Sequence, residues 1–402
     1  MRVRPFSFAL ILLVSATTAA TSQRPSDKLA ISDYLEWEQV QAPSFSPDGR
    51  QIVFGRRWVD KLNDKWETSV WIMNADGSRP RMLLKGSAPR WSPDGSRIAY
   101  VADGEPRGSQ IFVKWVDVEG PATQITRVNE APSDLTWTPD GKSILFRMNV
   151  PPATRPNWRV ENQLNAMRPR NATWTAAPRI VEKLNYRRDG TGFTTDNVSQ
   201  LFIVTSEGGT PRQITDDEHG IASIDLSPDG KMVYFSSGPR VADGEYQWRE
   251  SDVFTVDLTS GSIKQLTTRR GPDSGPAVSP DGKLVAYTGY DWTDDTWVDS
   301  RMYVMNADGG GSRVLTQSLD RSPGNLTWAT DGSGVYFTVQ DQGSQNLYFV
   351  SLRGDIKPVT VGAHMLSVAE ISPTGNAVGT LTSPHKPGDI VTFNVRRPTD
   401  IK

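Results

Sequence analysis

Short apolar runs with the period of β-strands recur along the chain, each directly after a turn-forming tetrapeptide. These runs are rich in β-branched and aromatic residues, as is typical of strands, and occupy 51–54, 97–100, 143–146, 232–235, 284–287 and 334–337. A second apolar run follows, as at 70–73, 201–204, 302–305 and 347–350. A shorter run ending in threonine closes several units, as at 124–126, 213–215 and 265–267. With a strand leading into each turn, the pattern predicts four strands per unit.

The tetrapeptide Ser-Pro-Asp-Gly marks the repeat. It begins at Ser46, Ser92, Ser227 and Ser279, and variants begin at Thr138, Ala329 and Ser372. Proline presets φ for a turn, aspartate can bond back to the backbone, and glycine accepts the left-handed conformation that completes a short hairpin. Successive motifs are 46, 46, 89, 52, 50 and 43 residues apart. Because blades of four strands repeat every ~40–50 residues, the predicted fold is all-β, a β-propeller of four-stranded blades.

The 89-residue interval decides the number of blades. It holds two blades if the sequence at 187–190 is a degenerate turn, and one blade with an insertion if it is not. The segment 149–178 contains five prolines and has no clear third or fourth strand. We therefore favour seven blades over eight, with an insertion at 149–199 in the third blade, and a loop of that length is usually functional or disordered.

The first twenty residues have the pattern of a secretory signal. Arg2 and Arg4 precede an apolar run from Phe6 to Val14, and small residues follow as far as Ala20. The apolar run is too short to span a bilayer, which requires roughly 20 residues. An uncleaved interfacial anchor is the alternative. We expect a signal peptide at 1–20 and a propeller domain at 21–402, periplasmic or extracellular after cleavage.

Composition narrows the chemistry. The 402 residues include no cysteine, which excludes disulfides, a thiolate nucleophile and zinc–thiolate or iron–sulfur sites. The 44 basic and 46 acidic residues give a net charge of −2, so there is no electrostatic reason to bind nucleic acid or anionic lipid. We expect neither a nucleic-acid nor a membrane partner, and no cofactor.

Two sets of aromatic and acidic residues have structural interpretations. Trp91, Trp137 and Trp328 each stand just before a turn motif, where a large ring can fill the wedge between blades. The acidic stretch 290–299 contains four aspartates but lacks the glycine and terminal glutamate of an EF-hand loop. We interpret it as a solvated loop and predict no metal site.

Known catalytic patterns are missing from the chain. No serine stands between glycines two residues away on either side, as a nucleophile elbow requires. The histidines, His219, His364 and His385, are far apart in sequence and form no HExxH pair. No catalytic residue is therefore assigned.

The repeated turns, the stretch Lys-Leu-Asn-Tyr-Arg-Arg-Asp-Gly-Thr-Gly-Phe at 183–193 and the strand at 200–204 resemble the propeller of exported serine peptidases of the prolyl oligopeptidase family, in the acylaminoacyl-peptidase or dipeptidyl-peptidase branch. The resemblance implies a propeller joined to an α/β-hydrolase domain with a Ser, Asp, His triad, restricting substrates to short peptides. No position matches the triad. Since the last apolar run, at 392–395, is followed by what looks like a truncated strand, we expect the C-terminal hydrolase domain to be absent. Alternatively, the segment at 33–36 supplies the missing strand and closes the ring.

The insertion holds the candidate substrate-binding residues, namely Arg159, Glu161, Glu182, Arg187 and Arg188. A carboxylate suits a free peptide amine, and an arginine suits a peptide carbonyl or carboxylate. Trp158 and Tyr186 could supply apolar walls, while the alternative is that these are solvated loop charges and packing aromatics. Two functions remain open: the substrate-gating propeller of a secreted peptidase, with a peptide substrate and a hydrolase domain as partners, or a stand-alone periplasmic propeller of TolB type that binds a protein.

Overall fold

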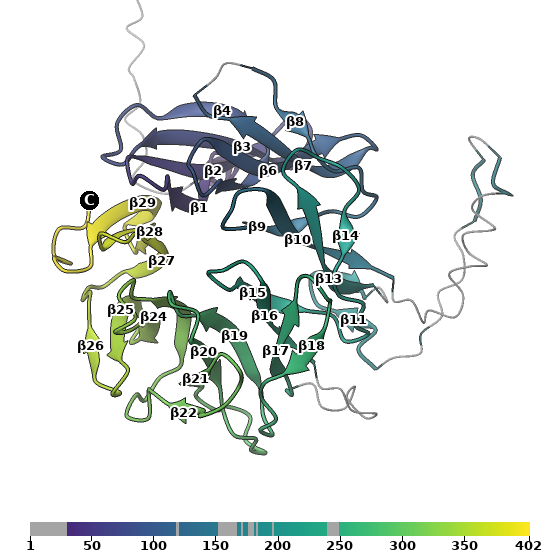
Figure 1. The fold of residues 1–402 in the computed structure, drawn as a ribbon. Coiled ribbons are helices and arrows are strands. Elements are labelled where there is room, and N and C mark those ends of the chain that lie inside the picture. Colours follow the sequence, from purple (N-terminus) through teal and green to yellow (C-terminus); the bar gives the residue numbers. More distant parts are fainter. Residues whose placement is uncertain are drawn as a thin grey trace, which may run out of the picture.

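The computed structural model describes residues 30–402, apart from 118–119, 152–166, 170–171, 176–180, 182–183, 195–196 and 239–248. Nearly all regular structure is β (Figure 1). The 3₁₀ helix η1 (Ile31–Leu35) precedes the first strand, and none of its side chains is buried. Within the described ranges no helix has the length and apolar character needed to cross a membrane. The alternative that residues 33–36 supply a ring-closing strand is wrong, because they belong to this helix and to its C-cap.

The strands form antiparallel groups that follow one another along the chain. The first two four-stranded sheets consist of β1 (Gln39–Phe45), β2 (Gln51–Asp60), β3 (Lys65–Asn74) and β4 (Arg81–Lys85), then β5 (Ser87–Trp91), β6 (Arg97–Gly104), β7 (Gly108–Trp115) and β8 (Thr123–Gln124). The third consists of β9 (Ser133–Trp137), β10 (Ser143–Val150), β13 (Val198–Thr205) and β14 (Arg212–Gln213). Between β10 and β13, β11 (Arg187–Arg188) and β12 (Gly192–Phe193) form a small separate hairpin.

The second half of the chain continues the same order. The fourth and fifth sheets consist of β15 (Ala222–Leu226), β16 (Met232–Ser237), β17 (Asp252–Asp257) and β18 (Ile263–Gln265), then β19 (Asp273–Val278), β20 (Leu284–Gly289), β21 (Arg301–Asn306) and β22 (Arg313–Val314). The last strands are β23 (Pro323–Trp328), β24 (Gly334–Asp341), β25 (Ser344–Ser351), β26 (Ile356–Pro358), β27 (Met365–Ile371), β28 (Asn376–Ser383) and β29 (Lys386–Asn394). A single residue pair joins β25 to β27, so β23–β26 and β27–β29 are two groups. We number these seven groups as blades one to seven.

The blades are arranged radially, with the first (purple) beside the last (yellow) in Figure 1. The first strand of each blade lies at the centre. Core residues pack between neighbouring blades, as where Ile144 and Phe146 of blade three share a cluster with Ile111 of blade two. The prediction of an all-β propeller is confirmed, with four strands in each of blades one to six and three in blade seven.

The turn motifs have the geometry that their sequence predicts. In the first turn the Gly49 N–H donates to the Ser46 carbonyl over 2.7 Å, and the Ser46 hydroxyl donates to Asp48 over 2.6 Å. Gly49 has φ +71°, in the left-handed region that glycine tolerates. The same hydroxyl–carboxylate bond recurs at Ser92, Thr138, Ser227 and Ser279. The interpretation of the tetrapeptide as a hairpin turn is therefore confirmed.

Tryptophans join neighbouring blades, as predicted. Trp91, Trp137 and Trp328 are buried. Each indole N–H donates to a backbone carbonyl of the preceding blade's first strand: Trp91 to Ser44 over 3.4 Å, Trp137 to Arg90 over 3.0 Å and Trp328 to Ala277 over 2.8 Å. A buried indole therefore contributes apolar contact and also satisfies a carbonyl at the unpaired inner edge of a sheet.

Blade one has no tryptophan before its turn, and a carboxylate of blade seven connects these two blades instead. Glu370, on β27 of blade seven, accepts hydrogen bonds from the backbone N–H of Phe45 over 3.0 Å and from the hydroxyl of Ser44 over 2.8 Å. Burial raises the pKa of Glu370, and these hydrogen bonds oppose the shift. The first and last blades therefore meet through this contact and through packing of β1 on β27 and β28. At the outer side of blade seven, Thr392 and Lys402 exchange two backbone hydrogen bonds of 2.9 Å.

Candidate functional site

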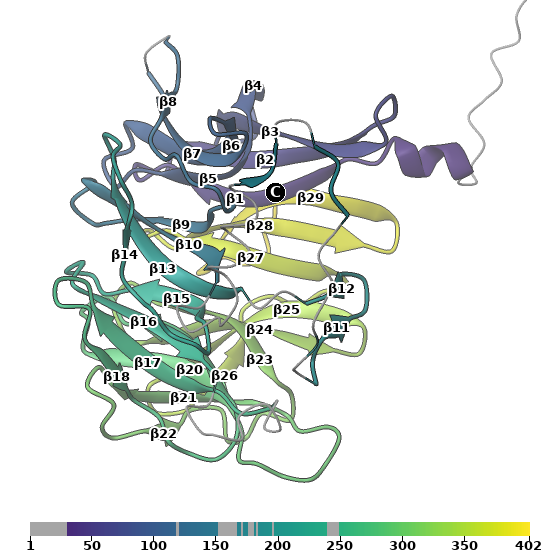
Figure 2. The ribbon, with the colours of Figure 1, turned by 90° about the vertical axis from the view of Figure 1, so that its right-hand side faces the viewer.

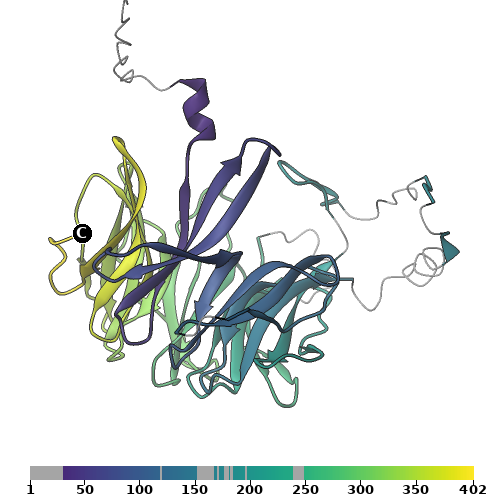
Figure 3. The same cartoon turned by 90° about the horizontal axis from the view of Figure 1, so that it is seen from above.

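The antiparallel order of strands divides the connections between two faces. The tetrapeptide turns and the turns between third and fourth strands lie on one face, which we call the turn face. The connections between second and third strands, and the crossovers from each fourth strand to the next blade, lie on the opposite side, the crossover face. Helix η1 and the hairpin β11–β12 both project from the crossover face, as Figures 2 and 3 show from two directions.

Most of the large exposed hydrophobic side chains in the described ranges lie on the crossover face. They are Ile31, Tyr34, Leu35, Trp37, Leu62, Trp66, Leu184, Tyr186, Phe193, Trp297, Val361 and Met365. Leu62, at the tip of the β2–β3 hairpin, is 91% exposed, and Val361, in the crossover between blades six and seven, is 85% exposed. A soluble monomer rarely leaves so many apolar side chains on one face unless that face contacts another surface.

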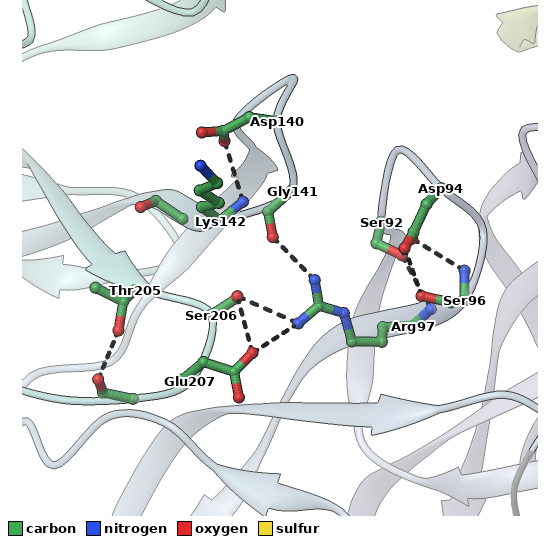
Figure 4. Close-up of polar contacts among 12 residues, drawn as sticks. Ser92, Asp94, Ser96, Arg97, Asp140, Gly141, Lys142, Thr205, Ser206 and Glu207 are labelled. Carbon is green, nitrogen blue, oxygen red and sulfur yellow. Dashed lines mark hydrogen bonds and ion pairs between the residues drawn. The ribbon is translucent and has the colours of Figure 1, made fainter.

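On the turn face of blades two and three, polar side chains connect the two blades. Figure 4 shows Arg97 of blade two reaching the turns of blade three, where its guanidinium donates to the Gly141 carbonyl over 2.9 Å and pairs with Glu207 over 3.1 Å. The guanidinium also lies 5.1 Å from the centre of the Trp137 ring. These contacts link adjacent blades, and the buried Nε of Arg97 has no hydrogen-bond partner within the described part of the chain.

A buried charge network occupies the crossover between blades four and five. Asp273, the first residue of β19, has no solvent exposure, and one of its carboxylate oxygens forms an ion pair with Arg269. The Arg269 guanidinium lies 4.5 Å from the centre of the Tyr303 ring and donates to Asp291 over 2.9 Å. The second carboxylate oxygen of Asp273 has no hydrogen-bond partner within the described part of the chain. Arg269 therefore connects the crossover to the acidic loop of blade five.

Burial dominates the electrostatics of this network. It raises the pKa of Asp273 to about 6, against the opposing charge of Arg269. It also raises the pKa of Asp252, which accepts hydrogen bonds of 2.9 Å from Thr267 and from Gln265. In blades two and three the position of Asp252 is held by Gln110 and Gln200, which bind the corresponding threonines. The fourth blade thus has a titratable carboxyl where blades two and three have a neutral amide.

The acidic loop of blade five is held in place by basic residues. Trp292 lies under the guanidinium of Arg270, with 5.0 Å between the guanidinium carbon and the ring centre, and the backbone N–H of Trp292 donates to the Arg270 carbonyl over 3.0 Å. Arg249 donates to the Asp295 carbonyl over 2.5 Å. No group of three or more carboxylate or histidine side chains suited to a metal ion occurs in the described ranges.

The sequence-predicted site residues are only partly visible. Arg187 and Arg188 form β11, both are exposed, and the ring of Tyr186 lies 6.2 Å from that of Phe193 across the hairpin. Arg159, Glu161, Glu182 and Trp158 lie outside the described residues. The sequence did not point to Arg269, Asp252 and Asp273. The available signal was the aspartate at the first residue of the third strand of blade four, where blades two and three have glutamine.

The three histidines lie at separate places on the crossover face. His219 is in the crossover from blade three to blade four, where its backbone N–H donates to the Asp217 carboxylate over 2.9 Å. His364 is in the crossover from blade six to blade seven, and burial lowers its pKa. His385 is at the tip of the β28–β29 hairpin. The described residues therefore bring no pair of histidines together.

Sequence comparison relates the chain to a family of propeller domains and to peptidases. Residues 171–387, more than half of the chain, match the model of the family described as acylaminoacyl-peptidase, N-terminal β-propeller domain. The chain is 26% identical over 370 residues to the uncharacterized peptidase YuxL of Bacillus subtilis, covering 87% of this chain and 54% of that protein. It is 24% identical over 374 residues to dipeptidyl-peptidase 5 of Porphyromonas gingivalis, covering 89% and 53%.

Solved structures agree on the fold. Pyrococcus horikoshii acylaminoacyl peptidase superposes with a TM-score of 0.66 at 16% identity, covering 90% of this chain and 52% of that one. The β-propeller domain of the Trilobed protease from Pyrococcus furiosus, described as having an open velcro topology, superposes with a TM-score of 0.62 at 16% identity, covering 91% and 97%. The chain thus spans about half the length of the curated relatives that it matches.

Proposed function

Because the chain belongs to the family of acylaminoacyl-peptidase N-terminal β-propeller domains, we propose that it is the non-catalytic, substrate-gating portion of an exported serine-type peptidase that acts on short peptides. The crossover face is the surface that meets the catalytic domain. The single observation that carries this assignment is the concentration of exposed apolar side chains on that face.

Two parts of the crossover face are suited to docking. Around η1, the rings of Tyr34 and Trp37 lie 4.8 Å apart, and both are exposed. On the adjacent β2–β3 hairpin, Trp66 is exposed beneath the guanidinium of Arg57 at 4.3 Å. Aromatic and arginine side chains are the types that contribute most to protein interfaces. We assign this part of blade one to the contact with the catalytic domain.

The insertion of blade three is assigned to the peptide. The hairpin β11–β12 presents Arg187 and Arg188 on the crossover face, beside the exposed ring of Tyr186. In this proposal the arginines bind peptide carbonyls or a terminal carboxylate, and Arg159, Glu161 and Glu182 of the same connection supply further anchors. The N-terminal pattern at 1–20 supports export to the periplasm or the cell exterior.

The test begins with the coding sequence that follows the Lys402 codon. We expect a Gly-x-Ser-x-Gly pattern followed by aspartate and histidine within about 250 residues. The chain should then be produced with that region and compared with the hydrolase region alone, on a chromogenic dipeptide and on casein. We expect the propeller to lower casein hydrolysis by about ten-fold or more while dipeptide hydrolysis is retained, because the ring excludes long chains.

Variants of the docking surface sharpen the test. Trp37→Ser together with Trp66→Ser should weaken the exclusion of casein, whereas Met82→Ser, an exposed apolar residue on β4, should not. The 402-residue chain alone should not react with a fluorophosphonate probe, since acyl transfer needs an activated nucleophile. Equal casein hydrolysis with and without the propeller would refute gating, and a stop codon after Lys402 would favour a TolB-like binding module.

A further inference from the structure

A cleft of about 490 Å³ opens on the turn face between blades six and seven. Its walls come from the turn of blade six, from strands β24, β25 and β26, and from the turn of blade seven with the residues after β29. It lies on the opposite side of the propeller from the surface assigned to the catalytic domain. The cleft is therefore independent of the proposed peptidase role.

The cleft follows from a local departure from the repeat. At the seams between blades three and four and between blades four and five, the turn proline packs against the glycine of the next turn: the Cβ position of Gly230 is 3.0 Å from Pro139, and that of Gly282 is 3.5 Å from Pro228. At the seam between blades five and six it does not, since nothing lies within 4 Å of the Cβ position of Gly332. The turn of blade six reads Ala-Thr-Asp-Gly, with Thr330 in place of proline. The Thr330 hydroxyl donates a hydrogen bond to the Pro373 carbonyl of blade seven over 3.4 Å. The seam between blades six and seven consequently lacks a proline ring at this position.

Blades four and six have a tyrosine at the same position of the repeat, but the surroundings of the two tyrosines differ. In blade four the Tyr234 hydroxyl donates to the Ala307 carbonyl of blade five over 3.2 Å. In blade six the equivalent Tyr336 lines the cleft, and its hydroxyl forms no hydrogen bond within the described part of the chain. The ring of Tyr336 packs on Phe349 at 5.0 Å. The cleft thus has an aromatic floor with an available hydroxyl group.

Two cationic side chains from different blades face this floor. Lys357 of β26 places its ammonium 5.2 Å from the centre of the Phe349 ring, and Arg396 follows β29. In the described ranges neither side chain forms an ion pair, whereas Lys231 and Lys283 on the same face pair with turn aspartates over 3.9 and 3.5 Å. Asp331 is the carboxylate among the residues that line the cleft. The lining therefore carries a net positive charge.

We propose that this cleft binds a short acidic peptide segment, with carboxylates at Lys357 and Arg396 and an apolar side chain on Tyr336 and Phe349. Its volume lies within the range of ~300–1,000 Å³ typical of ligand sites and exceeds what an inorganic oxyanion fills. The aromatic floor provides apolar contact that such an ion cannot use. Cations on opposite walls suit two carboxylates on one chain.

The probe is a fluorescent peptide, acetyl-Glu-Leu-Glu-amide, titrated with the 402-residue chain at low ionic strength, and acetyl-Gln-Leu-Gln-amide is its matched control. We expect saturable binding of the glutamate peptide, with the glutamine peptide about ten-fold weaker, because two charge-assisted hydrogen bonds are lost. Lys357→Met and Arg396→Met should each lower affinity about three-fold or more, and Lys283→Met should leave it unchanged. Raising the salt concentration should weaken binding.

A closing variant tests the geometry independently of charge. Thr330→Pro restores the motif and should narrow the cleft, weakening peptide binding while the thermal denaturation midpoint is kept or raised. Equal binding of the two peptides, or an equal effect of Lys283→Met, would overturn the proposal. So would inorganic phosphate that competes as well as the glutamate peptide, since the site would then be one for small oxyanions.

Discussion

The seam between blades four and five is closed, whereas the seam between blades six and seven is open, although the residues concerned occupy the same positions of the repeat. Pro228 packs toward Gly282, Tyr234 donates to Ala307, and Asp225 accepts the Val278 N–H over 2.7 Å. In the second seam a threonine replaces the proline and the tyrosine hydroxyl has no such partner, which leaves the cleft.

The difference shows how a repeat fold acquires local functions. Backbone geometry is alike in both seams, because both turns keep the aspartate and the left-handed glycine, with φ of +72° at Gly230 and +69° at Gly332. Only a few side chains differ. Interblade packing is therefore a property of individual side chains, and changes to them convert a core seam into an open surface without altering the blades.

The largest expected effect on stability comes from changing the buried charge network of the closed seam. Arg269→Ala removes the ion-pair partner of fully buried Asp273 and the contact with Tyr303, and should lower the free energy of unfolding by about 2–4 kcal/mol. Arg396→Ala, in the open seam, should change it by less than about 0.5 kcal/mol. Urea denaturation monitored by tryptophan fluorescence gives both values. Losses of equal size would show that the two seams do not differ in this respect.

The next largest expected effect is on the pH dependence of the unfolding free energy, through Asp273 in the closed seam. Burial raises the pKa of Asp273 to about 6, above 3.8, so the folded state binds its proton more tightly than the unfolded state. The stabilising contribution of this group is complete below about pH 4 and is lost as pH rises toward 6, by up to about 3 kcal/mol. Asp273→Asn should remove that part of the decline when stability is measured from pH 4 to 7.

Asp94, in a turn of blade two, is the control of opposite sign. Hydrogen bonds from Ser92 and Ser96 lower its pKa to about 2. Its contribution is therefore present above pH 4 and lost as pH falls toward 2. If Asp94→Asn and Asp273→Asn changed the pH profile in the same direction, burial would not be the dominant influence on Asp273.

The smallest expected effect is the difference in unfolding free energy between variants of Tyr234 and Tyr336. Tyr234→Phe removes a hydrogen bond to a carbonyl of the next blade and should cost about 0.5–1.5 kcal/mol of unfolding free energy. Tyr336→Phe should cost about 0.3 kcal/mol or less, because its hydroxyl faces the cleft. Thermal and chemical denaturation of the two variants can be compared directly. A larger cost for Tyr336→Phe would mean that the seam between blades six and seven is closed in solution.

Local sequence predicted the units well because each turn determines its own hairpin. A tetrapeptide with proline, aspartate and glycine in order has little choice of conformation, and the apolar run that follows is then paired with its neighbour. The tryptophans before the turns were likewise interpretable, since a buried indole at a repeated position indicates a repeated wedge. The ring-closing role expected as an alternative for residues 33–36 failed because that segment has no strand partner and forms η1 instead.

The candidate sites were far less predictable. Arg269 and Asp273 are four residues apart, but their importance depends on Tyr303, which comes from another strand, and Asp291, which comes from a loop. The apolar crossover face is made of residues from the segment before β1 and from four separate connections, none of which is unusual alone. Nothing in the local pattern around Lys357 or Arg396 indicates that they share a cleft.

The sequence by itself determined the strands, the turns and the radial repeat of this protein, because backbone conformation and strand period depend on neighbouring residues. Only the tertiary structure decided which seams are filled, which carboxyls are buried and which face is apolar. These properties arise where side chains from different blades meet, as Glu370 meets Phe45 across 325 residues of sequence. Burial and pairing depend on that meeting, so they become visible only once the ring is closed.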